Sequence, residues 1–594
     1  MSISRKLSEC RRWFRHQTIV GILLILGFVT FITYLNTTTD LGSQKNGESI
    51  RLPANRESGS WANEELPGES DPRTIMTPDQ LGNFEIPMPP KTDEPGDYGE
   101  PVRVDGSKAE VQRAMNEFGF NTYVSDMISM NRTIPDVRMS ECKYWQYPVD
   151  LPTASVVIAF HNEGWSPLLR TVHSVLLRSP NHLIKEVILV DDFSSKEHLK
   201  SRLDEYVEKF GGKIKLIRNA EREGLIRTRT IGAKAATGDV VIFLDAHCEV
   251  NYNWLPPLLA PIRHNRKVMT VPVIDGIDMN TWEYRRVYGD ADRHFRGIFE
   301  WGLLYKETEI SSEEKKRRKF NSEPFRSPTH AGGLFAIEKK WFEELGYYDP
   351  GLQIWGGEQY ELSFKVDFLF DVVFKIWQCG GGILFVPCSH VGHVYRNHMP
   401  YGFGKLSGKP VISTNMLRVI KTWMDEYDKY YYIREPAAVK REWGDINEQL
   451  ELRKRLNCKP FSWFMKYVAY DVPKSYPLLP DNDVWGEAKN PTTGKCIDTL
   501  GNPVPGIVIR LNKAGQMAQG EWCISPSGKH LMTNHCHKGT VDGPYKYDRS
   551  TQQIRDHHRD ICLAVSSDVG STDLHQIACD ESDPYQKFVW TEKY

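Results

Sequence analysis

The feature that most constrains the fold is an alternation of strand-like and helix-like segments between residues 155 and 247. The strand-like runs are short, apolar and β-branched, and they cover residues 155–160, 185–192, 213–219 and 239–247. The segments between them have apolar residues at helical spacing and cover residues 166–179, 196–209 and 225–237. Such alternation is typical of a mostly parallel sheet covered by helices, so we expect an α/β fold.

Polar residues stand at the carboxyl ends of three of these four strands. His161-Asn162-Glu163 follow the first strand, Asp191-Asp192 end the second, and Asp245-Ala246-His247 end the fourth. In open α/β sheets ligands bind at the carboxyl ends of the strands, so three such endings together argue for a binding site. One ending alone would fit an ordinary strand-end turn more readily.

The Asp-x-His sequence at the end of the fourth strand predicts a metal site. Alternate residues of an extended chain share a face, so Asp245 and His247 point the same way. A carboxylate with an imidazole suits Mn²⁺ or Zn²⁺. A zinc hydrolase usually has three protein ligands, whereas Mn²⁺ bound to a diphosphate needs fewer. Arg222 and Arg227 flank the start of the third helix, where they face either an anionic nucleotide or only solvent.

The N-terminal region contains an uncharged apolar run of about 18 residues, at the lower end of a membrane-spanning length. Several Lys and Arg precede it, and none follows until Lys45. This asymmetry predicts a cytosolic tail over residues 1–17, a type II signal anchor over residues 18–35, and a lumenal remainder. A cleaved signal peptide is the alternative, but the run is long for one and no small-x-small cleavage site stands out after it.

Residues 36–105 are rich in Pro, Gly, Ser, Asp and Glu, which predicts a flexible stem. The lumenal side favours disulfides and glycosylation, and it holds ten of the 11 cysteines and the sequon Asn131-Arg132-Thr133. A chain of 594 residues is too long for one core. Its 75 Lys and Arg nearly balance its 77 Asp and Glu, so the charge indicates no nucleic-acid partner.

The C-terminal part of the chain has a different pattern. Beyond a Pro-rich joint at residues 476–483, helical periodicity is poor, and short strands, many turns and five cysteines occur. Similar stretches recur at uneven spacing: "GKCIDT", "EWCISP" and "DICLAV". We expect a small separate β domain over residues 482–594, and the recurring stretches suggest repeats of roughly 40 residues.

Seven motifs in order resemble the polypeptide N-acetylgalactosaminyltransferases: "VVIAFHNE", "ILVDDFS", "REGLIRTR", "FLDAHCE", "AGGLFAIEK", "IWGGEQYELSF" and "PCSHVGHVYR". The resemblance covers about residues 135–475. It implies a catalytic domain of the GT-A (Rossmann-like) fold over residues 106–475 and a ricin-type β-trefoil lectin domain after it. It also implies residence in the Golgi membrane and retaining transfer of N-acetylgalactosamine (GalNAc) from UDP-GalNAc to Ser or Thr. The "WGGEQYE" form is most similar to the subgroup that prefers peptides already carrying GalNAc.

The resemblance also assigns roles to single residues. It implies that Mn²⁺ is held by Asp245, His247 and His393. It places four residues on the nucleotide side, namely His161, Asp192, Arg222 and Ala246. Glu358 and Trp355 would border the sugar and the acceptor, and Arg396 and Tyr401 would lie on a loop that closes over the diphosphate. No carboxylate stands out as a covalent nucleophile, so our hypothesis is a front-face route in which the leaving phosphate helps to deprotonate the acceptor hydroxyl.

Each assignment has a purely structural alternative. Asp192 could be a cap, Trp355 a core residue, and His393 a satisfied core histidine. Glu358 could pair with a nearby cation. Two positions depart from the family pattern. Met399 stands where a His often precedes Pro-Tyr, with His398 just before it, and Ala159 stands where the family usually has Thr.

The cysteines follow the family pattern as well. The resemblance implies the disulfides Cys142–Cys388 and Cys379–Cys458, and the β-trefoil pattern allows Cys523–Cys536 and Cys562–Cys579. Cys248 is expected to be a free buried thiol, and Cys496 lacks an obvious partner. The sugar-binding Asp of the trefoil pattern remains only as Asp498. GalNAc binding through the first repeat and a purely structural trefoil are therefore both open.

Ten residues that the family pattern lacks, Val366–Lys375, separate "ELSFK" from "IWQCGG". If they extended a continuous helix, everything after them would shift by about 15 Å. The alternative hypothesis for function is therefore a catalytically impaired, lectin-like or scaffold homologue.

Overall fold

The computed structural model describes residues 78–104, 108–287, 293–365, 379–498, 508–528, 530–536, 538–568 and 573–594. The predicted anchor, most of the predicted stem and the stretch Val366–Lys375 lie outside these ranges. Within them, no helix is long and apolar enough to cross a membrane.

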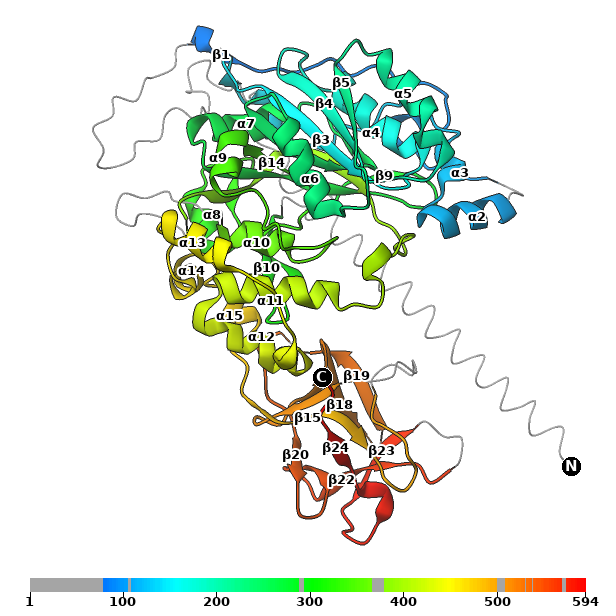
Figure 1. Ribbon diagram of the computed structural model, residues 1–594, viewed down its shortest axis with the longest axis vertical. Coiled ribbons are helices and arrows are strands. Elements are labelled where there is room, and N and C mark those ends of the chain that lie inside the picture. Colours follow the sequence, from blue (N-terminus) through cyan, green and yellow to red (C-terminus); the bar gives the residue numbers. More distant parts are fainter. Residues whose placement is uncertain are drawn as a thin grey trace, which may run out of the picture. The chain divides into compact units, whose positions relative to one another are not determined.

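A mixed sheet forms the centre of the α/β domain (Figure 1). In the described residues its strands run in the order β12-β14-β8-β13-β6-β3-β4-β5, with β7 beside β14 and β9 beside β8. Their bounds are β3 Ala154–Phe160, β4 Ile184–Asp191, β5 Ile214–Arg218, β6 Val240–Asp245, β7 Cys248–Val250, β8 Val268–Ile277, β9 Tyr284–Arg285, β12 Phe325–Arg326, β13 Phe335–Glu338 and β14 Gly382–Val394. The predicted strands are β3, β4, β5 and β6, and they pair in parallel, which confirms the α/β fold.

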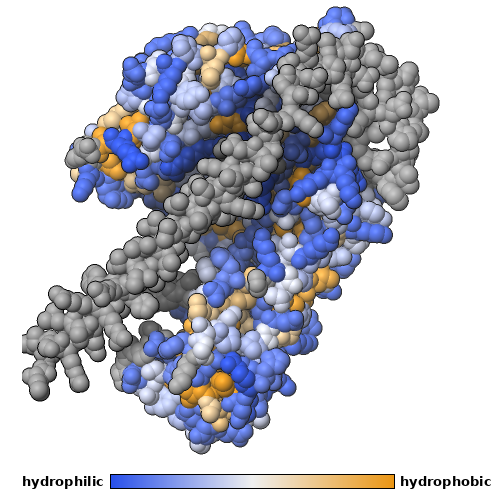
Figure 2. Space-filling model, turned by 180° about the vertical axis from the view of Figure 1, so that it is seen from behind, coloured by the Kyte–Doolittle hydropathy of each residue, from blue (hydrophilic) through white to orange (hydrophobic). Residues whose placement is uncertain are grey.

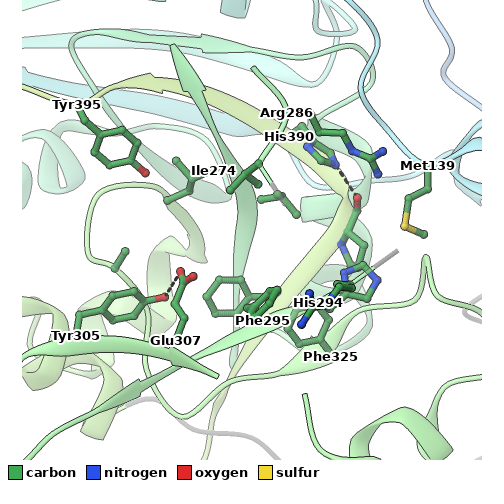
Figure 3. A pocket seen from close by; sticks show the side chains of 16 residues that line it. Met139, Ile274, Arg286, His294, Phe295, Tyr305, Glu307, Phe325, His390 and Tyr395 are labelled. Atoms are coloured by element: carbon green, nitrogen blue, oxygen red, sulfur yellow. Dashed lines mark hydrogen bonds between the residues drawn. The ribbon is translucent and has the colours of Figure 1, made fainter. Parts of the chain in front are cut away.

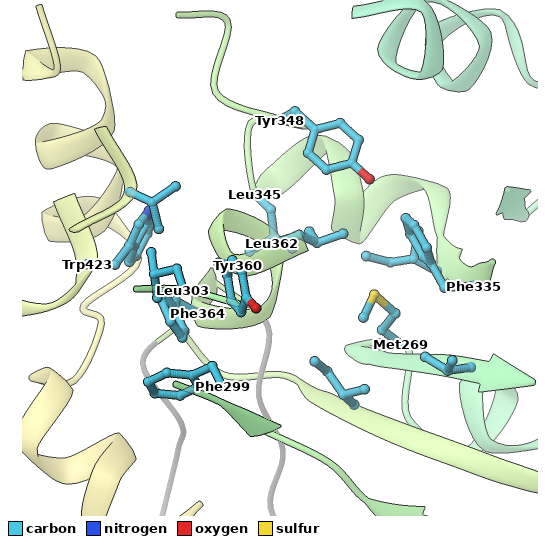
Figure 4. Close-up of a cluster of buried hydrophobic side chains, with 14 of the residues drawn as sticks. Met269, Phe299, Leu303, Phe335, Leu345, Tyr348, Tyr360, Leu362, Phe364 and Trp423 are labelled. Carbon is cyan, nitrogen blue, oxygen red and sulfur yellow. The ribbon is translucent and has the colours of Figure 1, made fainter. Parts of the chain in front are cut away.

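Helices cover both faces of this sheet, so its parallel strands are buried on both sides. One apolar core packs α4, α5 and α7 against β3 and β6, through residues such as Val172, Leu203 and Leu258. The other packs α6, α9, α10 and α11 against the opposite face, and Figure 4 shows part of it around Tyr360, Phe364 and Trp423. The helices of the domain are α2 Lys108–Phe118, α3 Thr122–Ser125, α4 Trp165–Leu177, α5 Ser201–Glu208, α6 Leu225–Ala235, α7 Leu255–His264, α8 Ser312–Arg317, α9 Lys339–Glu344, α10 Glu358–Lys365, α11 Val411–Trp423, α12 Asp428–Arg434, α13 Asn447–Arg455, α14 Phe461–Tyr467 and α15 Val472–Ser475.

The predicted stem boundary at residue 105 needs correction. Strand β1, Leu81–Gly82, pairs with β2, Tyr147–Pro148. Asp97 is buried, and its carboxylate accepts hydrogen bonds from the backbone N–H and the hydroxyl of Thr133 at 2.6 and 2.7 Å. Polar side chains and backbone pairing hold this segment to the α/β domain, and such contacts leave no apolar periodicity in the sequence.

The predicted fourth strand is also shorter than expected. It was predicted to reach His247, but β6 ends at Asp245, and a two-residue turn leads into β7. The backbone carbonyl of His247 accepts a hydrogen bond from the Val394 N–H at 3.2 Å, so this turn is held by β14.

The C-terminal residues form an antiparallel all-β domain, as expected. Its core contains Ile509, Ile554, Leu563 and Phe588. Its strands are β15 Asn482–Lys489, β16 Ile509–Asn512, β17 Met517–Gln519, β18 Trp522–Ser527, β19 His530–His535, β20 Tyr545–Asp548, β21 Gln553–Asp556, β22 Ile561–Val565, β23 Leu574–Ala578 and β24 Val589–Thr591.

Four disulfides join eight of the ten described cysteines, and they are the expected pairs: Cys142–Cys388, Cys379–Cys458, Cys523–Cys536 and Cys562–Cys579. Cys248 is free and buried, and Cys496 is free and exposed. The described surface in view in Figure 2 is mostly hydrophilic, with apolar residues in small separate groups. Most apolar side chains therefore serve the cores.

Candidate active site

Three strands bring the predicted metal ligands together. β14 pairs with β7 so that His393 lies opposite Cys248, directly after the turn that carries His247. His393 Nε2 is 3.4 Å from Asp245 Oδ2, and the ring centroids of His247 and His393 are 4.9 Å apart. The side chains are only partly accessible, with 23, 12 and 13% exposed for Asp245, His247 and His393.

The chemistry of this group fits a divalent cation. Burial alone would raise the pKa of Asp245, but the contacts with His393 and Arg229 outweigh it and hold the carboxyl well below its usual pKa. Burial and the nearby Arg396 charge lower the pKa of His247, which favours the neutral imidazole that a metal requires. His393 Nδ1 is buried without a hydrogen-bond partner. Among the described residues, however, no three His, Cys, Asp or Glu side chains form a completed metal site. The three side chains would therefore have to move to hold a cation together.

Glycine makes room beside the inner carboxylate oxygen. A Cβ at Gly333 would lie 2.7 Å from Asp245 Oδ2, far closer than such contacts allow. The "AGG" stretch therefore keeps one side of Asp245 open, on the oxygen that faces His393. A cation or a substrate group can approach there without a side chain in the way.

Arg229 of α6 is a site residue that the sequence analysis missed. Its side chain is 2% exposed, and it donates to Asp245 Oδ1 at 2.8 Å. It also donates to the Gly332 carbonyl at 2.8 Å. Arg222 and Arg227 were the arginines predicted to face the nucleotide, yet the Arg227 side chain is 42% exposed and pairs with Glu223. The sequence did contain a signal for the burial of Arg229. It follows the buried Ile226 by one helical turn, so both side chains lie on the same face of α6.

Glu163 was noted as part of a polar strand end but given no role. In the structure it is buried, and its Oε2 lies 3.0 Å from His247 Nδ1 and 2.6 Å from Arg396 Nη2. One carboxylate thus contacts both a predicted metal ligand and a residue of the predicted closing loop.

The residues that were predicted to bind the nucleotide lie close together around the ends of β3 and β4. Asp192 is buried, and its carboxylate accepts from the backbone N–H groups of Glu223 and Gly224 at 2.8 and 2.9 Å and pairs with Arg222. It therefore shapes the loop before α6. His161 Nδ1 lies 2.7 Å from the Asp192 carbonyl, and burial together with the Arg222 charge lowers its pKa to about 4. Ala246 is buried in the turn.

The predicted closing loop lies against this cluster. The Tyr401 ring packs edge-on against His161 at a centroid distance of 5.8 Å. The guanidinium groups of Arg222 and Arg396 lie 5.4 and 5.8 Å from the same ring. His398, by contrast, contacts the Asn116 carbonyl through Nε2 at 3.2 Å. Tyr401 therefore stands between two cations that can face an anionic group.

Trp355 and Glu358 stand at the start of α10. Trp355 is 41% exposed, so it is not a core residue. Glu358 is 3% exposed, and its Oε2 accepts from the Gly356 N–H at 2.7 Å. Burial raises the pKa of Glu358, and the charge of Arg229 opposes that shift. The charges of Arg229 and Asp245 thus both act on the Glu358 carboxyl.

A cavity of about 280 Å³ lies between β8 and β14 and the hairpin of β10, Phe295–Phe299, and β11, Tyr305–Glu309 (Figure 3). Its wall combines aromatic and charged side chains, among them Phe295, Phe325, Tyr305, Glu307 and Arg286. Tyr395 also lines it, and its ring centroid lies 4.6 Å from that of His393. In strand order, β8 and β14 lie on the opposite side of β6 from β4, which carries the predicted nucleotide residues.

Two predicted residues lie away from this edge. Asn131 is exposed, while its sequon partner Thr133 is buried and bonded to Asp97. Asp498 is half-buried in the C-terminal domain, directly before residues outside the described ranges.

Comparisons with known proteins identify both domains. Residues 155–344 match the glycosyl transferase family 2 profile, and residues 484–588 match the ricin-type beta-trefoil lectin domain. "Probable N-acetylgalactosaminyltransferase 7" of Caenorhabditis elegans is 57% identical, with 100% of both chains covered. "N-acetylgalactosaminyltransferase 7" of Drosophila melanogaster is 52% identical over 88% of this chain and 90% of its own length. Human "Polypeptide N-acetylgalactosaminyltransferase 10" is 50% identical over 69% of this chain and 65% of its own length.

Among solved structures, the "Crystal structure of GalNAc-T7 with UDP, GalNAc and Mn2+" is similar with a TM-score of 0.78 and 42% identity. The match covers 87% of this chain and 97% of that chain. It therefore extends over the α/β domain and the all-β domain together. With relatives this similar over nearly the whole length, the chain belongs to the polypeptide N-acetylgalactosaminyltransferase family.

Proposed function

We propose that this chain transfers GalNAc from UDP-GalNAc to Ser or Thr hydroxyls of proteins, with retention at the anomeric carbon. The observation that carries the proposal is the convergence of Asp245, His247 and His393 at the carboxyl edge of the sheet. The solved relative that contains UDP, GalNAc and Mn²⁺ supports the same donor and metal.

Asp245, His247 and His393 are the residues that would hold Mn²⁺. When bound, the cation supplies Lewis-acid stabilisation of the negative charge that develops on the departing diphosphate. Arg222 and Arg396 add two further positive charges beside Tyr401, and the partly buried setting makes their attraction for phosphate stronger than in water. Tyr401 covers the diphosphate and excludes water from it.

The sugar of the acceptor occupies the cavity of Figure 3, which lies on the opposite side of β6 from β4, and the exposed Trp355 contacts the acceptor peptide. The cavity volume of about 280 Å³ is near the lower end of small-molecule sites, roughly 300–1,000 Å³. Aromatic walls with charged groups between them suit a pyranose, whose C–H face packs on rings while its hydroxyls form hydrogen bonds. This supports a preference for peptides that already carry GalNAc.

The transfer proceeds from the front face, with a donor phosphate oxygen accepting the proton of the acceptor hydroxyl. Glu358 is buried and accepts from the Gly356 N–H, so its carboxylate orients groups rather than attacking the sugar. A glycosyl-enzyme adduct on Glu358, sought by mass spectrometry after donor is mixed with the chain, would contradict this route.

The remaining expectations complete the proposal. Residues 1–17, 18–35 and the stem place the catalytic domain, which extends to residue 475, in the Golgi lumen. Residues 482–594 form the lectin domain, which contacts GalNAc through Asp498. Asn131 carries the N-linked glycan. A shift in mass after enzymatic deglycosylation, lost in Asn131→Gln, tests the last assignment.

The decisive experiment measures transfer by the purified full-length chain with UDP-GalNAc and Mn²⁺, on matched peptides with and without GalNAc. We expect transfer that requires Mn²⁺ and is faster on the glycosylated peptide. A folded chain without any transfer refutes the proposal and favours the impaired homologue. In that case, recovery of activity after deletion of Val366–Lys375 would identify this stretch as the cause.

A further inference from the structure

Glu163 occupies a special position at the candidate site, because one of its oxygens serves two partners. Its side chain is 3% exposed, and Oε2 lies 3.0 Å from His247 Nδ1 and 2.6 Å from Arg396 Nη2. Oε1 accepts from the Gly164 N–H at 3.0 Å, which fixes the orientation of the carboxylate. Nδ1 and Nη2 are also 3.3 Å apart, as expected for two donors that share one acceptor.

The contact with His247 decides which ring nitrogen can bind a cation. An ionised carboxylate can only accept hydrogen bonds, so Nδ1 of His247 carries the proton. The lone pair is then on Nε2, which is the nitrogen left for a metal. Carboxylates behind metal-binding histidines have this effect on tautomer and ring orientation in general.

The contact with Arg396 links the same carboxylate to the closing loop. Arg396 Nη1 donates to the Phe118 carbonyl at 2.7 Å, and its guanidinium lies 4.7 Å from the Phe120 ring centre. Between these residues, Gly119 accepts from the Asn397 N–H at 3.1 Å. A Cβ at Gly119 would lie 2.7 Å from the His398 carbonyl, so the loop backbone packs against this glycine.

We propose that Glu163 is a positioning residue that couples Mn²⁺ binding at His247 to docking of the loop that carries Arg396. The coupling rests on the proposed function, because it takes His247 as a metal ligand. Glu163 orients His247 for metal binding, and the docked Arg396 holds Glu163 in the orientation that does so. Each event therefore strengthens the other.

Glu163→Gln tests the carboxylate at nearly constant volume. The amide oxygen can accept from His247 or from Arg396, but the amide NH₂ then faces the other donor. Either His247 takes the wrong tautomer or Arg396 loses its partner. We expect Mn²⁺ affinity to fall by about 10- to 100-fold, the usual cost of losing a partner behind a metal-binding histidine. The measurement is a titration of the full-length chain with Mn²⁺ alone, with free Mn²⁺ followed by electron paramagnetic resonance.

Arg396→Lys tests the coupling from the loop side without changing a buried carboxylate. Lysine keeps the charge but cannot reach the Phe118 carbonyl and Glu163 together. We expect weaker Mn²⁺ binding in this variant. In the double variant with Glu163→Gln, we expect no further loss, because the two residues act through one contact.

Glu186→Gln is the matched control. Glu186 is also a buried glutamate, bonded to Ser155 and paired with Lys215, but it lies near the start of β4. The Mn²⁺ affinity of the Glu186→Gln variant should equal that of the wild type. Equal Mn²⁺ affinities of the wild type, Glu163→Gln and Arg396→Lys would overturn the coupling, as would additive losses in the double variant. A wild type that binds no Mn²⁺ would instead overturn the metal assignment behind the proposed function. If Glu163→Gln fails to fold, Arg396→Lys alone decides.

Discussion

Replacing Arg229 tests how the buried charges of the site stabilise the catalytic domain. Arg229 lies 2.8 Å from Asp245 Oδ1, and at an effective dielectric constant of roughly 20 two unit charges at that distance attract by about 6 kcal/mol. Desolvation of both groups offsets much of this attraction. Removing one partner of a buried pair leaves the other unpaired, which costs about 3–5 kcal/mol. We expect Arg229→Met to lower the free energy of unfolding by that amount in the absence of metal.

Arg229→Lys separates charge from geometry. Lysine keeps a positive charge near Asp245 but loses the forked donors that reach the Gly332 carbonyl as well. We expect a smaller loss, roughly 1–2 kcal/mol, the cost of one or two hydrogen bonds. Urea unfolding at pH 7 with a metal chelator, followed by tryptophan fluorescence, measures both variants.

Mn²⁺ gives the sharper comparison. A ligand at 100 times its Kd stabilises the folded state by about 2.7 kcal/mol. In Arg229→Met the cation also supplies the positive charge that Asp245 has lost, so Mn²⁺ should recover more stability there than it adds to the wild type. A loss below about 1 kcal/mol in Arg229→Met, or an equal Mn²⁺ effect in both proteins, would refute the account of this ion pair.

Three further predictions concern Trp355 and Tyr401 at the site and Glu186 near the start of β4, away from it. Trp355→Ala should change the free energy of unfolding by less than about 0.5 kcal/mol because the side chain is exposed, yet raise the KM for the acceptor peptide. Tyr401→Ala should raise the KM for UDP-GalNAc by about 5- to 30-fold, as expected if its contacts with Arg222 and Arg396 contribute about 0.5–1 kcal/mol each, and Tyr401→Phe should not. For Glu186, burial alone would raise the pKa, but hydrogen bonds hold it at about 2, below its ordinary 4.5. The stability that this carboxylate contributes is present above pH 4.5 and lost as pH falls toward 2, so the urea midpoints of wild type and Glu186→Gln should converge over that window.

The sequence predicted those parts of the fold that depend on local pattern. Strands β3, β4, β5 and β6 begin and end within two residues of the predicted positions, because each is a short apolar run between helical segments. The order β12-β14-β8-β13 could not be predicted. It places antiparallel β13 between β6 and β8, and such pairing depends on residues far apart in sequence.

The candidate site was predictable only where its residues stand at strand ends. Asp245 and His247 follow an apolar run, so their position at the end of a predicted strand indicated a binding site. Glu163 and Arg229 are equally buried, but a glutamate after a strand and an arginine in a helix are usually solvated. Their partners explain the burial: a histidine from the turn after β6 for Glu163, and the carbonyls of Gly332 and Gly333 for Arg229. No local pattern contains those partners.

The position of His393 bears on whether the extra stretch Val366–Lys375 impairs the site. Strand β14 pairs with β8 in parallel and with β7 in antiparallel, and both ladders fix His393 opposite Gly276 and Cys248. This register is set by backbone hydrogen bonds between strands, which are independent of how many residues connect α10 to β14. The 15 Å displacement that a continuous helix would cause is therefore absent at His393. Glu358 precedes the stretch and His393 follows it, and both interact electrostatically with Asp245. Residues on both sides of the stretch therefore belong to one site, which favours the active transferase over the impaired homologue.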